Sequence, residues 1–145
     1  LAADRVLSEL PSDVKVIFVD MHAEATSDMQ LMGRYLDGRV SAVLGTHTHV
    51  PTADAQIFAG GTAFQCDVGM TGPYDSILGR RIDRVTQATV TFLPTPCDVA
   101  KGAVRLSGSM VDIDEATGKA TAITPVMLNE GDVQALAKEM DDVVP

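Results

Sequence analysis

A strand-helix-strand pattern over residues 14–44 constrains the fold of this 145-residue chain more than any other feature. Residues 14–20 and 40–44 are almost continuous apolar runs rich in β-branched side chains, which is typical of strands covered on both faces. A segment of helical periodicity joins them, and such a crossover connects parallel strands. The pattern therefore predicts an α/β fold in which both strands end at the same edge of a sheet.

The helix between these strands is predicted from residue 26 or 27 to residue 37. Thr26 or Ser27 is the expected N-cap, and Gly38 supplies a C-terminal stop. Its apolar residues recur at the spacing of one helical face: Met29, Met32 and Leu36. We expect this face to be part of the core.

All three histidines of the chain follow these two strands. His22 comes after the first strand, and His47 and His49 come after the second. In extended backbone, residues i and i+2 point to the same face, so His47 and His49 could serve one ion or two adjacent ions. Ligands of open α/β sheets bind outside the carboxyl ends of the strands, and imidazole suits zinc, iron and manganese. The arrangement favours a metal site, although a single buried histidine is more often structural.

Four carboxylates lie near the histidines in the sequence: Asp20, Glu24, Asp54 and Asp67. Each could ligate a metal or orient an imidazole. Asp54 and Asp67 lie in turn-rich sequences, where a side-chain hydrogen bond to the local backbone is the more common role. The sequence leaves both alternatives open.

Outside this unit, the sequence predicts short strands, helices and one long hairpin. The expected segments are a helix at 2–10, strands at 55–58 and 62–66, a helix at 82–92, hairpin strands at 103–114 and 119–126, and an acidic amphipathic helix at 130–143. We expect residues 1–128 to belong to one domain and residues 129–145 to form a loosely attached tail helix.

Composition excludes some partners. The net charge is −9, which argues against non-specific binding to nucleic acid and to anionic membranes. The chain has no signal-like segment and no span of about 20 apolar residues, so a cytoplasmic location is expected. Cys66 and Cys97 lack metal-ligand spacing, and we expect both to be buried as small hydrophobic residues.

Several longer motifs carry a resemblance. They are HAEATS at 22–27, YLDGRVSAV at 35–43, GTHTHV at 45–50, TAD at 52–54, DVGMTGPYDS at 67–76, VDID at 111–114 and TGKA at 117–120. Over about residues 14–126 the chain resembles the YmdB-type branch of calcineurin-like metallophosphoesterases.

This resemblance implies an α/β fold: the carboxyl-terminal half of a layered α/β/β/α sandwich, with a mixed sheet, a βαβ unit and a terminal β-hairpin. It also implies a metal-dependent phosphodiesterase acting on 2′,3′-cyclic nucleotides or related small phosphodiesters. Two divalent ions, iron or manganese and alternatively zinc, would form the centre. By position in the motifs, His22 and His47 would ligate one ion and His49 the other.

The amino-terminal ligands of this family and its catalytic histidine have no counterpart here, so the chain matches only the carboxyl-terminal half. We expect the isolated chain to be inactive and to form a homo-oligomer through uncovered sheet surfaces. One alternative is another metal hydrolase with an HxH motif, such as an amidohydrolase, which requires the repeated βα units of a barrel. The other is a non-catalytic module that binds metal or a protein partner.

Overall fold

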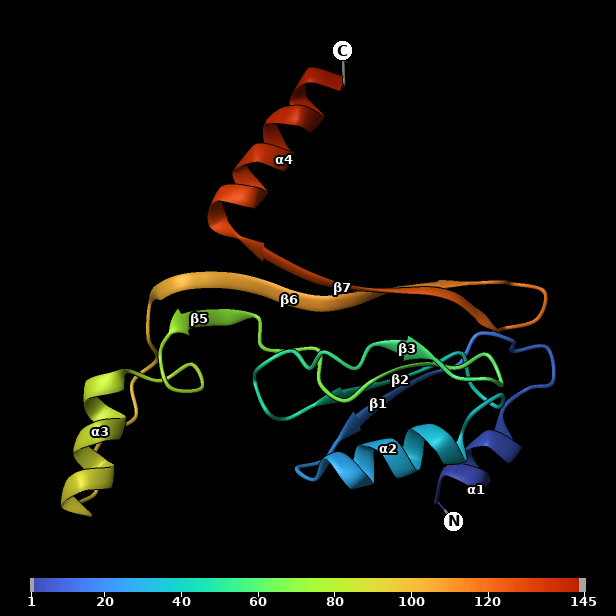
Figure 1. Ribbon diagram of the computed structural model, residues 1–145, viewed down its shortest axis with the longest axis horizontal. Coiled ribbons are helices and arrows are strands. Elements are labelled where there is room, and N and C mark those ends of the chain that lie inside the picture. Colours follow the sequence, from blue (N-terminus) through green and yellow to red (C-terminus); the bar gives the residue numbers. More distant parts are fainter. Residues whose placement is uncertain (1, 144–145) are drawn as a thin grey trace.

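The structure is a computed structural model that describes residues 2–143. The strands are β1 (Phe18–His22), β2 (Ala42–Thr46), β3 (Gln56–Ile57), β4 (Ala63–Gln65), β5 (Gly72–Asp75), β6 (Gly102–Ile113) and β7 (Ala120–Asn129). The helices are α1 (Ala2–Glu9), α2 (Thr26–Tyr35), α3 (Ile82–Thr91) and α4 (Glu130–Val143). One sheet has the order β1-β2-β4-β3 and is parallel except for β3, and the other is antiparallel with the order β5-β6-β7 (Figure 1).

The predicted βαβ unit is confirmed. Strands β1 and β2 pair in parallel, with α2 as the crossover and His22 opposite Thr46. The position and environment predicted for the first strand are wrong, because β1 begins only at Phe18 and lies at the edge of its sheet. Strand β1 has a neighbouring strand on one side only and is therefore poorly covered. Phe18 of β1 is 59% exposed, and Val16, two residues before it, is 48% exposed.

Helix α2 packs its predicted apolar face on the mixed sheet. Met29 and Leu36 are buried in a cluster that includes Phe64 of β4. The predicted N-cap is wrong: Ala25 occupies this position, and its carbonyl oxygen accepts the first N–H groups of the helix. The predicted stop is consistent with the structure, because Gly38 follows the helix with φ at 77°, a conformation that favours glycine.

The antiparallel sheet lies against the face of the mixed sheet that α1 and α2 leave free (Figure 1). Ala42 and Ala63 pack with Ala120 between the sheets, so small side chains allow a close approach. The Ser109 hydroxyl of β6 donates a 2.5 Å hydrogen bond to the buried Gln65 side chain of β4. These two open sheets do not form the closed barrel that an amidohydrolase requires.

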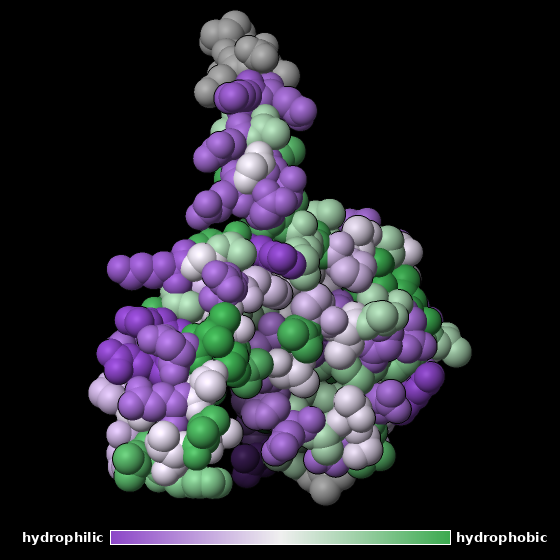
Figure 2. Space-filling view, turned by 60° about the vertical axis from the view of Figure 1, so that its left-hand side comes forward, coloured by the Kyte–Doolittle hydropathy of each residue, from purple (hydrophilic) through white to green (hydrophobic). Residues whose placement is uncertain are grey.

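The predicted hairpin and outer helices are also confirmed, with β7 continuing to Asn129. Helices α3 and α4 both lie at the end of the antiparallel sheet opposite the hairpin turn, and α4 does not lie across the sheet (Figure 1). The face of α4 seen in Figure 2 is mainly hydrophilic. The described residues thus show three layers, α/β/β. Within residues 2–143 no helix is long and apolar enough to cross a membrane.

We expect the chain to self-associate through the free edge of β1. This edge presents unpaired backbone groups beside the exposed Phe18 ring, and burying a phenylalanine contributes roughly 1.5–3 kcal/mol. Light scattering should show particles larger than a monomer, and Phe18→Glu should shift them toward monomer. Leu31→Glu, on the exposed face of α2, is the control. Monomeric particles for the unmodified chain at moderate concentration would contradict the prediction.

Candidate metal centre

The three histidines line one cavity of about 180 Å³ at the carboxyl ends of β1 and β2. The parallel pairing of these strands brings together residues that are 25 positions apart in the chain. The other residues that line the cavity are Thr46, Asp67, Gly69 and Met70. The prediction that the histidines meet at one edge of the sheet is confirmed.

His22 and His47 make direct contact. The Nε2 atom of His22 and the Nδ1 atom of His47 lie 3.1 Å apart, and the two rings meet edge to face at 83°. Two imidazole nitrogens that share one ion at about 2.0–2.1 Å lie roughly 2.9–3.4 Å apart, for angles between perpendicular and tetrahedral. The observed separation of the two nitrogens therefore suits ligation of a single ion.

His49 reaches the cavity by a different route from the one predicted. Strand β2 ends at Thr46, and His49 has φ at 66° in the left-handed region, so the expected extended HxH is wrong. The chain turns here because local hydrogen bonds and the buried Asp67 hold it. The Nδ1 atom of His49 is buried without a hydrogen-bond partner in the structure. A buried ring nitrogen without a hydrogen-bond partner raises the free energy of the folded chain, and a metal ion bound to its lone pair would satisfy it.

Asp67 clamps the histidine turn. It is 1% exposed, and its two oxygen atoms accept hydrogen bonds from the backbone N–H of Thr48, at 2.6 Å, and of Gly69, at 2.8 Å. The Thr48 bond joins two segments that are distant in sequence, and it fixes the backbone between His47 and His49. The carboxylate lines the cavity, but both of its oxygen atoms already position backbone.

Asp54 and Glu24 are not among the described residues that line the cavity. Asp54 accepts a hydrogen bond from the backbone N–H of Cys66 at 3.2 Å. Burial raises the pKa of Asp54, but hydrogen bonds from Cys66 and Thr52 outweigh it and leave the pKa below its usual value. This carboxylate is therefore held in place by backbone at the end of β4, 12 positions away, and not by the local backbone of its own turn as its sequence suggested.

Thr46 is a site residue that the sequence analysis did not identify. Its Oγ1 atom lies 3.0 Å from Nδ1 of His22 and donates a 3.3 Å hydrogen bond to Asp20. Only the register of the parallel pair, with His22 opposite Thr46, reveals this contact. The sequence indicated this contact only indirectly. Thr46 directly precedes His47, and it ends a strand that is predicted to pair with the strand of His22.

The donor set is incomplete on its own. Among the side chains that the structure describes, those of residues 2–139, no three from His, Cys, Asp or Glu lie close enough together to hold an ion. Two ring nitrogens converge and a third, on His49, has no partner, so these residues fit part of the coordination of a metal. Further ligands would have to come from outside this set.

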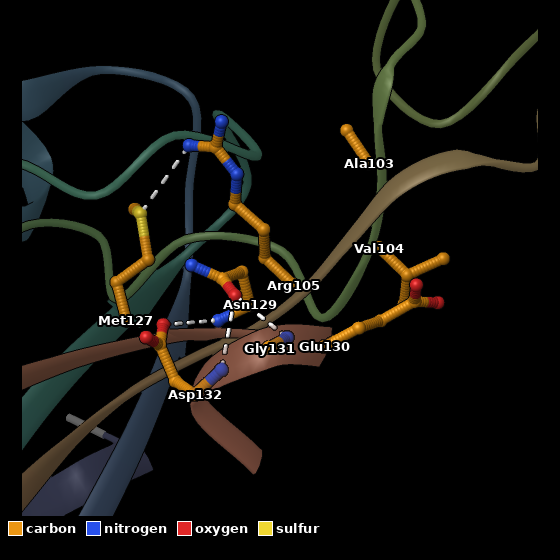
Figure 3. A pocket seen from close by; sticks show the side chains of 8 residues that line it. All are labelled: Ala103, Val104, Arg105, Met127, Asn129, Glu130, Gly131 and Asp132. Carbon is orange, nitrogen blue, oxygen red and sulfur yellow. Dashed lines mark hydrogen bonds between the residues drawn. The ribbon is translucent and has the colours of Figure 1, made fainter. Parts of the chain in front are cut away.

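A larger cavity, of about 570 Å³, lies between β6, β7 and the start of α4 and shares no lining residue with the histidine cavity (Figure 3). Its polar atoms already have a structural role. The side-chain oxygen of Asn129 accepts hydrogen bonds from the backbone N–H of Gly131 and Asp132, and the Asp132 carboxylate accepts one from the backbone N–H of Asn129. This is a helix cap, and we do not assign function to it.

The two cysteines differ, which corrects the prediction that both are buried: Cys97 is exposed and Cys66 is buried. Burial, with the neighbouring Asp54, raises the pKa of Cys66 to about 12. Because the thiolate is the reactive form, a disulfide reagent at pH 8 should label one thiol per folded chain rapidly. The second thiol should react only in denaturant, and Cys97→Ser should remove the rapid phase. Two rapidly reacting thiols in the folded chain would contradict this prediction.

Comparisons with known proteins identify similar sequences. A family described as YmdB-like protein matches residues 1–126. The 2′,3′-cyclic-nucleotide 2′-phosphodiesterase of Bacillus subtilis (strain 168) is 48% identical over 130 residues, which are 90% of this chain and 49% of that enzyme. The chain spans about half the length of the curated relatives it matches.

Solved structures show the same fold. A hypothetical protein from Thermus thermophilus superposes with a TM-score of 0.82 at 43% identity, covering 89% of this chain and 50% of that one. A crystal structure described as a novel phosphatase, from Mycoplasma pneumoniae, also gives a TM-score of 0.82, at 28% identity, covering 99% of this chain and 50% of that one. Both sheets described above therefore correspond to half of a larger fold.

Proposed function

This chain belongs to the YmdB-like protein family, and we propose that it supplies part of the metal centre of a phosphodiesterase. The substrate we propose is a 2′,3′-cyclic nucleotide or a related small phosphodiester, and the ions are iron or manganese, with zinc as an alternative. His22 and His47 would hold one ion, and His49 would contribute to a second. The complete fold, about twice the length of this chain, would provide the remaining ligands.

The observation that carries this proposal is the contact between His22 and His47. Their ring nitrogens are 3.1 Å apart and both border the same cavity as His49, whose Nδ1 atom lacks a partner. A purely structural histidine cluster would satisfy each buried ring nitrogen with protein hydrogen bonds. The unsatisfied nitrogen at a carboxyl edge of the sheet favours an ion.

The charge of the chain makes cations at this site important. A phosphodiester is an anion, and the chain carries a net charge of −9. The electrostatic field of the chain therefore disfavours the approach of the phosphodiester. Bound metal ions would supply local positive charge and Lewis-acid activation of the phosphoryl group. Imidazole binds a metal ion in its neutral form, so the positive charge would come from the ions. Asp67 fixes the turn that presents His47 and His49.

We propose that the 145-residue chain alone is inactive, because three imidazoles offer no carboxylate to bridge two ions. A non-catalytic metal-binding module is the second candidate, because the converging nitrogens of His22 and His47 and the unpartnered Nδ1 atom of His49 suit an ion without specifying a reaction. The two candidates differ in what happens when the rest of the fold is present.

A chimera distinguishes them. The segment of the Bacillus subtilis enzyme that this chain matches would be replaced by this chain, which is 48% identical to it. We expect the folded chimera to hydrolyse 2′,3′-cyclic AMP with manganese, whereas the isolated chain does not. A chimera that melts cooperatively and binds manganese but has no activity would contradict the phosphodiesterase and support the non-catalytic module.

A further inference from the structure

A hydrogen-bonded chain of four side chains, three of which line the histidine cavity, joins the carboxyl ends of β1 and β2. Asp20 and His22 lie on the same face of β1, and Thr46 lies opposite His22 on β2. The Thr46 hydroxyl is 3.3 Å from Oδ1 of Asp20 and 3.0 Å from Nδ1 of His22. The Nε2 atom of His22 then lies 3.1 Å from Nδ1 of His47.

We propose that Thr46 is a positioning residue that keeps the proton of His22 on Nδ1 and so leaves the Nε2 lone pair facing the cavity. The assignment follows from counting protons. A carboxylate of Asp20 can only accept, so the single hydroxyl proton of Thr46 is directed to it. The Thr46 oxygen is then an acceptor toward His22, and Nδ1 of His22 has to be the donor.

The tautomer of His22 affects the site where the ion would bind. With its proton on Nδ1, neutral His22 presents an unprotonated Nε2, which accepts the N–H of His47 when no ion is present. The other tautomer would place a proton on Nε2, where a metal ligand needs a lone pair. Histidine ligands commonly donate their second N–H to a fixed acceptor, and loss of that acceptor typically weakens metal binding by about 10–100-fold.

Thr46 and Asp20 contribute unequally to the position of the His22 proton. The 3.0 Å contact of Thr46 with His22 has ordinary hydrogen-bond length, whereas 3.3 Å is long for the hydroxyl bond to Asp20. Thr46 therefore carries most of the effect, and Asp20 orients its hydroxyl. Asp20→Asn keeps a carbonyl oxygen that can accept the same proton, so we expect a smaller effect from it than from loss of the hydroxyl.

The test uses matched variants of the 145-residue chain. Thr46→Val removes the hydroxyl at nearly constant shape, and Thr46→Ser retains it. Thr121→Val is the control, because it removes a hydroxyl of β7 that bonds to the Asp112 carbonyl and does not line the histidine cavity. Nitrogen-15 NMR of the imidazole rings reports which nitrogen carries the proton, and thermal melts verify folding. With only three histidines in the chain, the signals can be assigned from single replacements.

In the metal-free chain we expect His22 to be protonated on Nδ1 in the unmodified protein, in Thr46→Ser and in Thr121→Val. In Thr46→Val, Nε2 should gain a substantial share of the proton. Retention of the Nδ1 proton in folded Thr46→Val, or its absence from the unmodified chain, would overturn the inference.

Zinc titration of the same proteins is the second measurement, and this part of the inference rests on the proposed function. Zinc affinity should fall about 10–100-fold in Thr46→Val and stay within about threefold in Thr46→Ser. Equal zinc affinity in folded Thr46→Val and the unmodified chain would contradict a role of Thr46 in metal binding. If the unmodified chain binds no zinc, the proposed metal centre fails, and the tautomer result still decides the role of Thr46.

Discussion

Replacing His47 with alanine should lower the turnover of 2′,3′-cyclic AMP by the chimera described above at least about 1000-fold. The reason is that His47 is one of two imidazoles whose nitrogens converge at 3.1 Å, so its loss leaves His22 as the one imidazole at that position. A metal ion contributes several kcal/mol of charge stabilisation in the transition state, and about 4 kcal/mol corresponds to roughly three powers of ten in rate.

The control for this substitution is Leu31→Ala, which shortens an exposed side chain on α2 and should leave turnover within about twofold. Steady-state rates with manganese, measured on chimeras with matched melting temperatures, provide the comparison. Activity of His47→Ala within tenfold of the unmodified chimera would show that His47 does not hold a catalytic ion.

Replacing Gly45 with alanine should lower the free energy of unfolding by at least about 3 kcal/mol. Gly45 lies in the buried part of β2, next to the end of β4, and a Cβ atom there would collide with the backbone carbonyl of Cys66 and press on Met29. Backbone cannot move aside as a flexible side chain can, so the strands would have to separate. Overpacking a core costs typically 1–3 kcal/mol, and a clash with backbone lies at the upper end or beyond.

Gly108→Ala is the matched control, because a Cβ atom at this position of β6 meets no other atom within 4 Å. Alanine is favoured over glycine within a strand by roughly 0.5–1 kcal/mol, so this variant should be as stable as the unmodified chain or slightly more so. Urea unfolding followed by circular dichroism measures both. Equal unfolding midpoints for Gly45→Ala and Gly108→Ala would show that β2 and β4 do not approach as closely as described.

The meeting of His22 and His47 could be predicted from the sequence because it depends on local pattern and topology. Two apolar runs joined by a helix specify parallel strands, and parallel strands end at the same edge. The long hairpin of β6 and β7 was predictable for a similar reason, since a turn-rich tetrapeptide separates two strand-like segments.

The details of the site depend on contacts that the sequence pattern does not contain. A shift of one residue in the register would remove Thr46 from its place opposite His22, and nothing local sets this register. The left-handed backbone at His49 is uncommon for a residue other than glycine. It occurs in a turn clamped by Asp67, which lies 19 positions beyond Thr48. The exposure of β1 likewise depends on its place in the sheet, which its apolar sequence does not reveal.

The most direct test of the account is a calorimetric titration of the 145-residue chain with zinc at neutral pH, repeated on His22→Ala and His49→Ala. Zinc is the suitable probe, because imidazole without carboxylate binds it better than manganese or magnesium. The account predicts weak binding to the unmodified chain and a loss of at least about tenfold in affinity in each folded variant. Unchanged zinc affinity in both variants would contradict the claim that the three histidines at the ends of β1 and β2 belong to one metal centre.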